Sequence, residues 1–188
     1  QAIERKGPGV TALIDDRSRP TLREQIGELL TSCTTADIAV GHVRLAALDL
    51  TAAETRGLRR CRMLLGRLDA SALTDFGYTD DRVDAHMQTL RAFLESGRVE
   101  IRSAGLSAWA PDFSVYRGIR EGGGICLMGA HYFRDPVAVN GPTFTAVLSD
   151  VRSVAAAVAR FDALWDRSHD VLEPVLTAVH RRQSFCAM

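Results

Sequence analysis

The sequence predicts an α/β domain in which helices flank a mixed β-sheet on both faces. Apolar runs alternate with amphipathic segments through the first half of the 188-residue chain. In the second half, two apolar runs at 113–118 and 124–130 flank a Gly-rich stretch, a pattern typical of a β-hairpin. Hydrophobic residues make up 46% of the chain, which is enough for a substantial core.

The first half of the chain alternates strands with helices. Leu22, Ile26 and Leu29 recur at helical spacing after Pro20, which favours an amphipathic helix with proline at its start. The short β-branched run at 37–43 is typical of a buried parallel strand. We therefore expect strands at 10–15, 37–43 and 61–66 and helices at 21–33 and 45–58.

The second half contains three helices and the remaining strands. Val83, Met87 and Leu90 share one face of a predicted helix, and Gly97 can cap its end. Pro174 interrupts the C-terminal helical pattern or starts a second helix. We expect helices at 82–97, 151–165 and beyond Pro174, and strands at 99–104, 113–118, 124–130 and 143–150.

We divide the chain into an N-terminal arm with a candidate first strand at 1–19 and one domain with C-terminal helices at 20–188. The start at Gln1, without methionine, is consistent with a fragment of a longer protein. Acidic and basic residues balance at 23 each, so no global basic field argues for nucleic acid. No apolar run approaches the roughly 20 residues of a membrane span, so we expect no membrane partner.

Cysteine usage gives no sign of a metal or a disulfide framework. The four cysteines lie far apart in sequence and form no CxxC or Cys/His cluster with metal-ligand spacing. We expect free thiols in a cytoplasmic protein, with neither a metal nor a cofactor. The cysteines are Cys33, Cys61, Cys126 and Cys186.

The order of elements, with "CLMGAHYF" at 126–133 and "FDALWDRSHDV" at 161–171, resembles the phospholipase D-like (HKD) superfamily over about residues 20–171. In that family two copies of an HxKxxxxD motif meet: one histidine attacks phosphorus and the other protonates the leaving oxygen. The resemblance implies a mixed sheet, a homodimer, and partners such as nucleic acid or a helicase or nuclease of bacterial restriction or defence systems.

This sequence departs from the catalytic motif. Against the family pattern, Asp112 stands at the histidine, Ser114 at the lysine and Tyr132 at the later asparagine. The only lysine in the chain is Lys6, so no HxK occurs anywhere. The resemblance therefore implies a degenerate member, and whether any catalysis remains is left open.

Two histidines are candidate catalytic residues. His131 follows a predicted strand and can act as a replacement acid, base or phosphate donor, or as an ordinary strand-end residue satisfied by backbone and solvent. His42, with Arg44, lies at the end of a predicted parallel strand, the usual side for a site in an α/β sheet. The candidate cleft-binding residues are Asp112, Ser114, Tyr116, His131, Tyr132 and Arg44.

Ser114 and Tyr116 alternate with Val115 in the predicted strand at 113–118. Ser114 and Tyr116 should share one strand face, where they contact a ligand if that face lines a cleft and are ordinary sheet residues if it does not.

Five arginines lie close together in sequence. They can contact phosphates or form a solvated helix end balanced by nearby aspartates. They are Arg56, Arg59, Arg60, Arg62 and Arg67.

Three functions remain open at this point. The first is a non-hydrolytic phospholipase D-like domain that acts in binding or assembly with nucleic acid or a partner enzyme. The second is a variant phosphodiesterase or nuclease that uses His131 or His42, with arginines replacing the lysine. The third is a structural dimerisation domain. The sequence identifies neither the substrate nor the partner.

Overall fold

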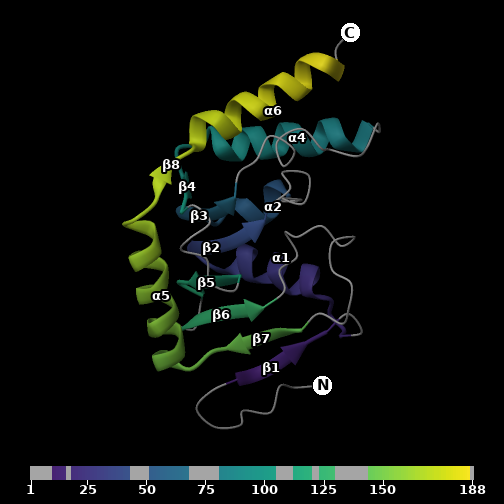
Figure 1. Ribbon diagram of the computed structural model, residues 1–188. Coiled ribbons are helices and arrows are strands. Elements are labelled where there is room, and N and C mark those ends of the chain that lie inside the picture. Colours follow the sequence, from purple (N-terminus) through teal and green to yellow (C-terminus); the bar gives the residue numbers. More distant parts are fainter. Residues whose placement is uncertain are drawn as a thin grey trace.

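A computed structural model shows one eight-stranded mixed sheet with helices on both faces, as predicted (Figure 1). The structure describes residues 10–15, 18–42, 51–67, 81–104, 112–119, 123–129 and 144–186, without the side chains of 42, 67, 81–87 and 181–186. The strand order is β1-β7-β6-β5-β2-β3-β4-β8. The strands are β1 (Val10–Ile14), β2 (Thr35–His42), β3 (Arg60–Arg67), β4 (Val99–Ser103), β5 (Phe113–Arg117), β6 (Gly124–Gly129), β7 (Thr145–Leu148) and β8 (His169–Asp170).

The centre of the sheet is parallel and its flanks are antiparallel. β2 pairs parallel with β3, and β3 pairs parallel with β4. β5 pairs antiparallel with both β2 and β6, as the predicted hairpin requires, and β7 continues the antiparallel half to β1. β8, a two-residue edge strand paired with β4, is too short for the sequence pattern to indicate.

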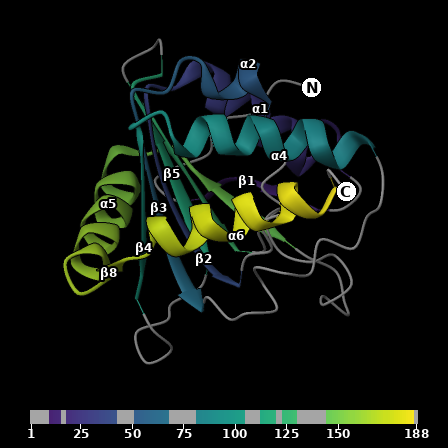
Figure 2. The ribbon, with the colours of Figure 1, turned by 90° about the horizontal axis from the view of Figure 1, so that it is seen from above.

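The helices divide unequally between the two faces of the sheet. The helices are α1 (Leu22–Ser32), α2 (Ala52–Thr55), α4 (Asp81–Leu94), α5 (Val151–Trp165) and α6 (Leu172–Cys186). Viewed from above, α5 lies alone on one side of the sheet, whereas α1, α2, α4 and α6 lie on the other (Figure 2). The predicted helix at 45–58 is described only from residue 51, where α2 forms a single turn.

Each face has its own hydrophobic core. The larger core packs α1, α4 and α6 on residues such as Ile38, Met63 and Tyr116. The smaller core packs α5 on Leu64 and Val115. Its members Phe161 and Trp165 stack with their ring centroids 5.6 Å apart. The alternation of side chains along each strand thus separates the two cores.

Helix starts follow local capping signals. Thr21 and Glu24 form a capping box at the start of α1, and Thr51 with Glu54 forms another at α2. Asp150 caps α5 by accepting a hydrogen bond from the backbone N–H of Ser153 at 2.9 Å. Within the described residues, none of the helices combines the length and the apolar character required to cross a bilayer.

Candidate functional site

The candidate site lies at the sheet edge where β2 and β6 end and β5 begins. This edge follows from the pairing directions, because β2 and β6 both run antiparallel to β5. Gly41 near the end of β2, Asp112 just before β5 and Gly129 at the end of β6 meet there. Ligands of open α/β sheets commonly bind beyond the carboxyl ends of the parallel strands, so this is the expected location of a cleft.

Asp112 ties these three strands together. Its Oδ1 accepts a hydrogen bond from the backbone N–H of Gly41 at 2.8 Å, and its carbonyl accepts one from the N–H of Gly129 at 3.0 Å. The β2–β5 ladder stops at the pair Ala39–Phe113, so the carboxylate continues the hydrogen bonding of β2 where backbone pairing ends. The side chain is 3% exposed. At this position the carboxylate therefore joins two strands.

Ser114 and Tyr116 share one face of β5, as predicted, and both side chains are fully buried. Tyr116 belongs to the larger core, whereas Val115 belongs to the smaller one on the opposite face. Burial raises the pKa of Tyr116 well above its usual range. The Ser114 hydroxyl opposes that shift, although the two hydroxyls do not reach ordinary hydrogen-bond geometry. Both hydroxyl groups therefore lie inside the protein and not on its surface.

Gly129 is the last residue of β6 at this edge, and its backbone adopts a conformation that favours glycine. Its φ is +127°, and a Cβ at this position would lie 2.4 Å from the carbonyl oxygen of Phe144. Its partner across the ladder, Thr145, is 1% exposed. The end of β6 therefore lies directly against the start of β7.

The other predicted site residues cannot be placed around this edge. Arg44, His131 and Tyr132 lie outside the described residues. His42 is the last residue of β2, next to Gly41, but its side chain is not described. In the described part of the chain, no group of three His, Cys, Asp or Glu side chains has the arrangement of a metal site.

The predicted arginine cluster is split by the fold. Arg56, Arg59 and Arg60 are exposed, whereas Arg62 is 8% exposed and points into the smaller core. The Arg62 Nε donates to Asp37 Oδ1 at 2.6 Å, and its Nη1 lies 2.8 Å from Asp162 on α5. Arg62 is therefore a structural residue, and its interpretation as a surface charge was wrong.

Two features of the structure have no counterpart in any sequence motif. One is Gly41, whose backbone N–H binds Asp112; only the pairing of β2 with β5 brings the two residues together. The other is a groove between α2 and α4, which depends on how two helices pack. Arg98 lies on this groove, and no motif in the sequence distinguishes it from the other arginines.

Comparisons with known proteins show the fold. No protein-family model and no curated protein matches the sequence. Among solved structures, the chain is similar to Nuc of Salmonella typhimurium, a phospholipase D family member, with 13% identity and a TM-score of 0.56, over 88% of this chain and 99% of Nuc. It is also similar to NucT of Helicobacter pylori, with 9% identity and a TM-score of 0.55, over 85% of this chain and 98% of NucT.

A third similar structure is TrmBL2, described as an archaeal chromatin protein with a novel mode of DNA binding. The identity is 17% and the TM-score 0.51; the match covers 90% of this chain but 57% of TrmBL2, so the chain spans little more than half of that protein. Identities this low identify architecture and leave activity open. The eight-stranded mixed sheet of this chain has the phospholipase D-like fold that the sequence predicts.

Proposed function

We propose that this chain is a non-hydrolytic phospholipase D-like domain that binds nucleic acid and assembles with a partner. The observation that carries the proposal is the hydrogen bond from the Gly41 N–H to the Asp112 carboxylate at 2.8 Å. Asp112 occupies the motif position at which the family has its nucleophilic histidine. Here that position holds a buried carboxyl group engaged in joining two strands.

The groups at positions 112 and 114 support loss of hydrolysis. The family mechanism needs a neutral nucleophile and a cation that holds the phosphate charge. Asp112 supplies a carboxylate, which repels a phosphate, and Ser114 supplies a neutral hydroxyl that is fully buried. Single catalytic groups are commonly worth factors of about 100 or more, so loss of both leaves phosphodiesterase activity near background.

Nucleic acid is the ligand that the comparisons favour. TrmBL2, which shares the fold, is described as binding DNA. Because the chain has no net charge, binding must depend on a local basic surface. We further propose that the domain acts as a homodimer beside a helicase or nuclease of a restriction or defence system. Cys33, Cys61 and Cys126, which are buried free thiols, support a cytoplasmic location.

Two assays on one nuclease-free preparation test the proposal. In the first, bis-p-nitrophenyl phosphate and supercoiled plasmid are incubated with the wild type and with His131→Ala and His42→Ala. We expect the three proteins to give the same background. Hydrolysis at an enzymatic rate that either substitution abolishes would overturn the proposal in favour of a variant phosphodiesterase.

The second assay measures fluorescence anisotropy of a labelled duplex over a salt series, with the oligomeric state followed by sedimentation. We expect affinity to fall with increasing salt, as phosphate contacts require. A stable dimer that binds neither duplex nor single strand would support a purely structural dimerisation domain instead.

A further inference from the structure

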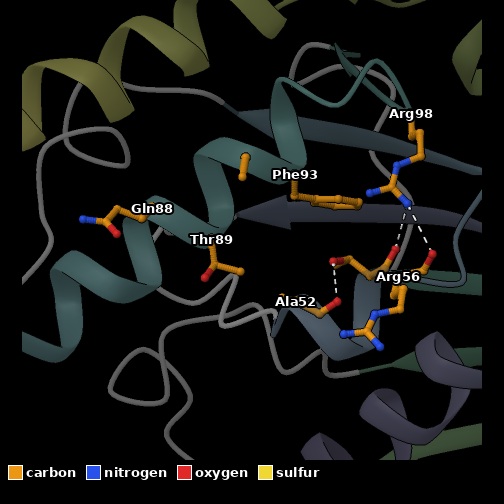
Figure 3. Close-up of a pocket in the computed structure, with 8 residues that line it drawn as sticks. Ala52, Arg56, Gln88, Thr89, Phe93 and Arg98 are labelled. Atoms are coloured by element: carbon orange, nitrogen blue, oxygen red, sulfur yellow. Dashed lines mark hydrogen bonds between the residues drawn. The ribbon is translucent and has the colours of Figure 1, made fainter.

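A groove between α2 and α4 lies apart from the Asp112 edge, beside the opposite ends of the parallel strands. It has a volume of about 570 Å³ and is open to solvent. Its polar lining comes from two guanidiniums, one amide and two threonine hydroxyls, and it includes no carboxylate among the described side chains. Ala52, Ala92 and Phe93 supply its apolar surface (Figure 3).

Arg98 is held in a fixed orientation on this groove. Its Nη1 donates to the carbonyl of Thr55, the last residue of α2, at 3.1 Å and to that of Leu58, just beyond the helix, at 2.9 Å. The guanidinium carbon lies 6.0 Å from the centre of the Phe93 ring. Figure 3 shows the other terminal nitrogen turned toward Phe93, away from these carbonyls. Nη1 is thus anchored to backbone and Nε donates to the Ser96 hydroxyl at 3.3 Å, which leaves the second terminal nitrogen to an acceptor.

Two further arginines extend the positive charge next to Arg98. Arg56 lines the groove and Arg59 follows it by three residues; both are exposed. Neither has a carboxylate partner within the described part of the chain.

The nearby carboxylates that the structure describes are already paired. Glu54 binds Arg23, with 2.9 Å between its Oε2 and the arginine Nη2. Glu100 accepts from Arg60 at 2.8 Å, and Glu95 accepts from Arg91 at 3.0 Å. The surface formed by Arg56, Arg59 and Arg98 therefore keeps a local positive charge in a chain whose total charge is zero.

We propose that Arg56, Arg59 and Arg98, with the α2–α4 groove, form the nucleic-acid surface of this domain and contact the sugar–phosphate backbone of duplex DNA. This inference rests on the proposed function, because it names where the DNA is held. Guanidinium and amide donors are among the groups that contact phosphates and sugars in protein–DNA interfaces. Such contacts carry no base recognition, so the surface binds DNA without sequence preference.

The test compares the double variant Arg56→Ala/Arg59→Ala with the wild type by duplex anisotropy between about 50 and 200 mM salt. The matched control is Arg152→Ala/Arg160→Ala, which removes two exposed arginines from α5 on the other face. The slope of log affinity against log salt is negative, and each lost phosphate contact reduces its magnitude by about 0.9. We expect the magnitude of this slope to fall by about two in the groove variant and to stay close to the wild-type value in the control.

The outcomes separate this surface from the general function. Wild-type binding that neither double variant changes would overturn the groove assignment and leave the proposed function standing. Equal losses in both variants would also overturn the assignment, since diffuse charge would then explain binding. Absence of binding by the wild type would overturn both. Loss of poly-glutamate binding in the groove variant, with duplex binding unchanged, would assign the groove to an acidic protein.

Discussion

The guanidinium of Arg62 on β3 and the carboxylate of Asp37 on β2 form an ion pair inside the protein, with 2.6 Å between Nε and Oδ1. Asp37 is 2% exposed, and its second oxygen lies 2.7 Å from Nη2 of Arg117 on β5. Arg62 also reaches Asp162 on α5, and its guanidinium carbon lies 4.7 Å from the centre of the Phe161 ring. One buried pair therefore connects three adjacent strands to the helix that covers them.

Removing one partner of this pair should be costly. Arg62→Ala leaves Asp37 as a buried anion with only Arg117 beside it, and breaking a buried pair in this way costs about 3–5 kcal/mol. Arg60→Ala is the matched control, because Arg60 lies on the same strand in an exposed pair with Glu100 and should cost about 0–1 kcal/mol. Urea unfolding measures both; similar losses in the two variants would contradict a structural role for Arg62.

The second prediction concerns Gly129 at the candidate site. Gly129→Ala places a methyl group against the Phe144 carbonyl at a φ of +127°, and positive φ alone costs about 1–3 kcal/mol in a non-glycine residue. Gly123→Ala is the control, because a Cβ there meets no atom within 4 Å. Thermal unfolding should show a clearly lower Tm for Gly129→Ala and a Tm near wild type for Gly123→Ala. The opposite order would show that the β6–β7 contact is not tight.

Buried thiols predict a loss of stability at high pH. Burial raises the pKa of Cys61 to about 12 and that of Cys33 to about 11. In the unfolded chain these thiols ionise near pH ~8.5. Because the folded-state pKa values are raised, the thiols' contribution is fully present below that pH and is lost as pH rises toward 11–12.

Urea unfolding between about pH 8 and pH 10 measures this dependence on either side of the thiol pKa of the unfolded chain. In the variant Cys33→Ala/Cys61→Ala, the free energy of unfolding should fall less steeply with increasing pH than in the wild type. The measured quantity is the slope of the free energy of unfolding against pH. The loss of packing in the variant lowers that free energy but does not change its slope. Identical slopes would mean that these thiols ionise equally in both states.

Most of the sheet could be predicted because its signals are local. The alternation in 99–103 and the turn between 117 and 124 are readable within one short window. Arg62 shows the limit of this reasoning. Its charge resembled that of its exposed neighbours, and its partner Asp37 lies 25 residues away. Only the parallel register of β2 and β3 places the two side chains on one face.

The candidate site could be predicted only in part, for a related reason. A motif alignment assigned Asp112 and Ser114 to catalytic positions but could not show what surrounds them. The burial of Ser114 and the bond from Gly41 to Asp112 depend on three strands meeting at one edge. The roles of His131 and Tyr132 remain predictions, since both lie outside the described residues.

The last prediction separates a structural carboxylate at position 112 from a chemical one. Asp112→Asn keeps an oxygen that can accept from the Gly41 N–H, whereas Asp112→Ala leaves that buried N–H without its acceptor. An unsatisfied buried donor costs about 1–3 kcal/mol, so urea unfolding should show that loss for Asp112→Ala and a far smaller one for Asp112→Asn. DNA anisotropy should be the same for Asp112→Asn and the wild type. If both variants unfold like the wild type, the Gly41 bond contributes nothing. If Asp112→Asn abolishes DNA binding or hydrolysis while its stability stays at the wild-type level, the charge at this position acts on a substrate, and this edge of the sheet is a functional site.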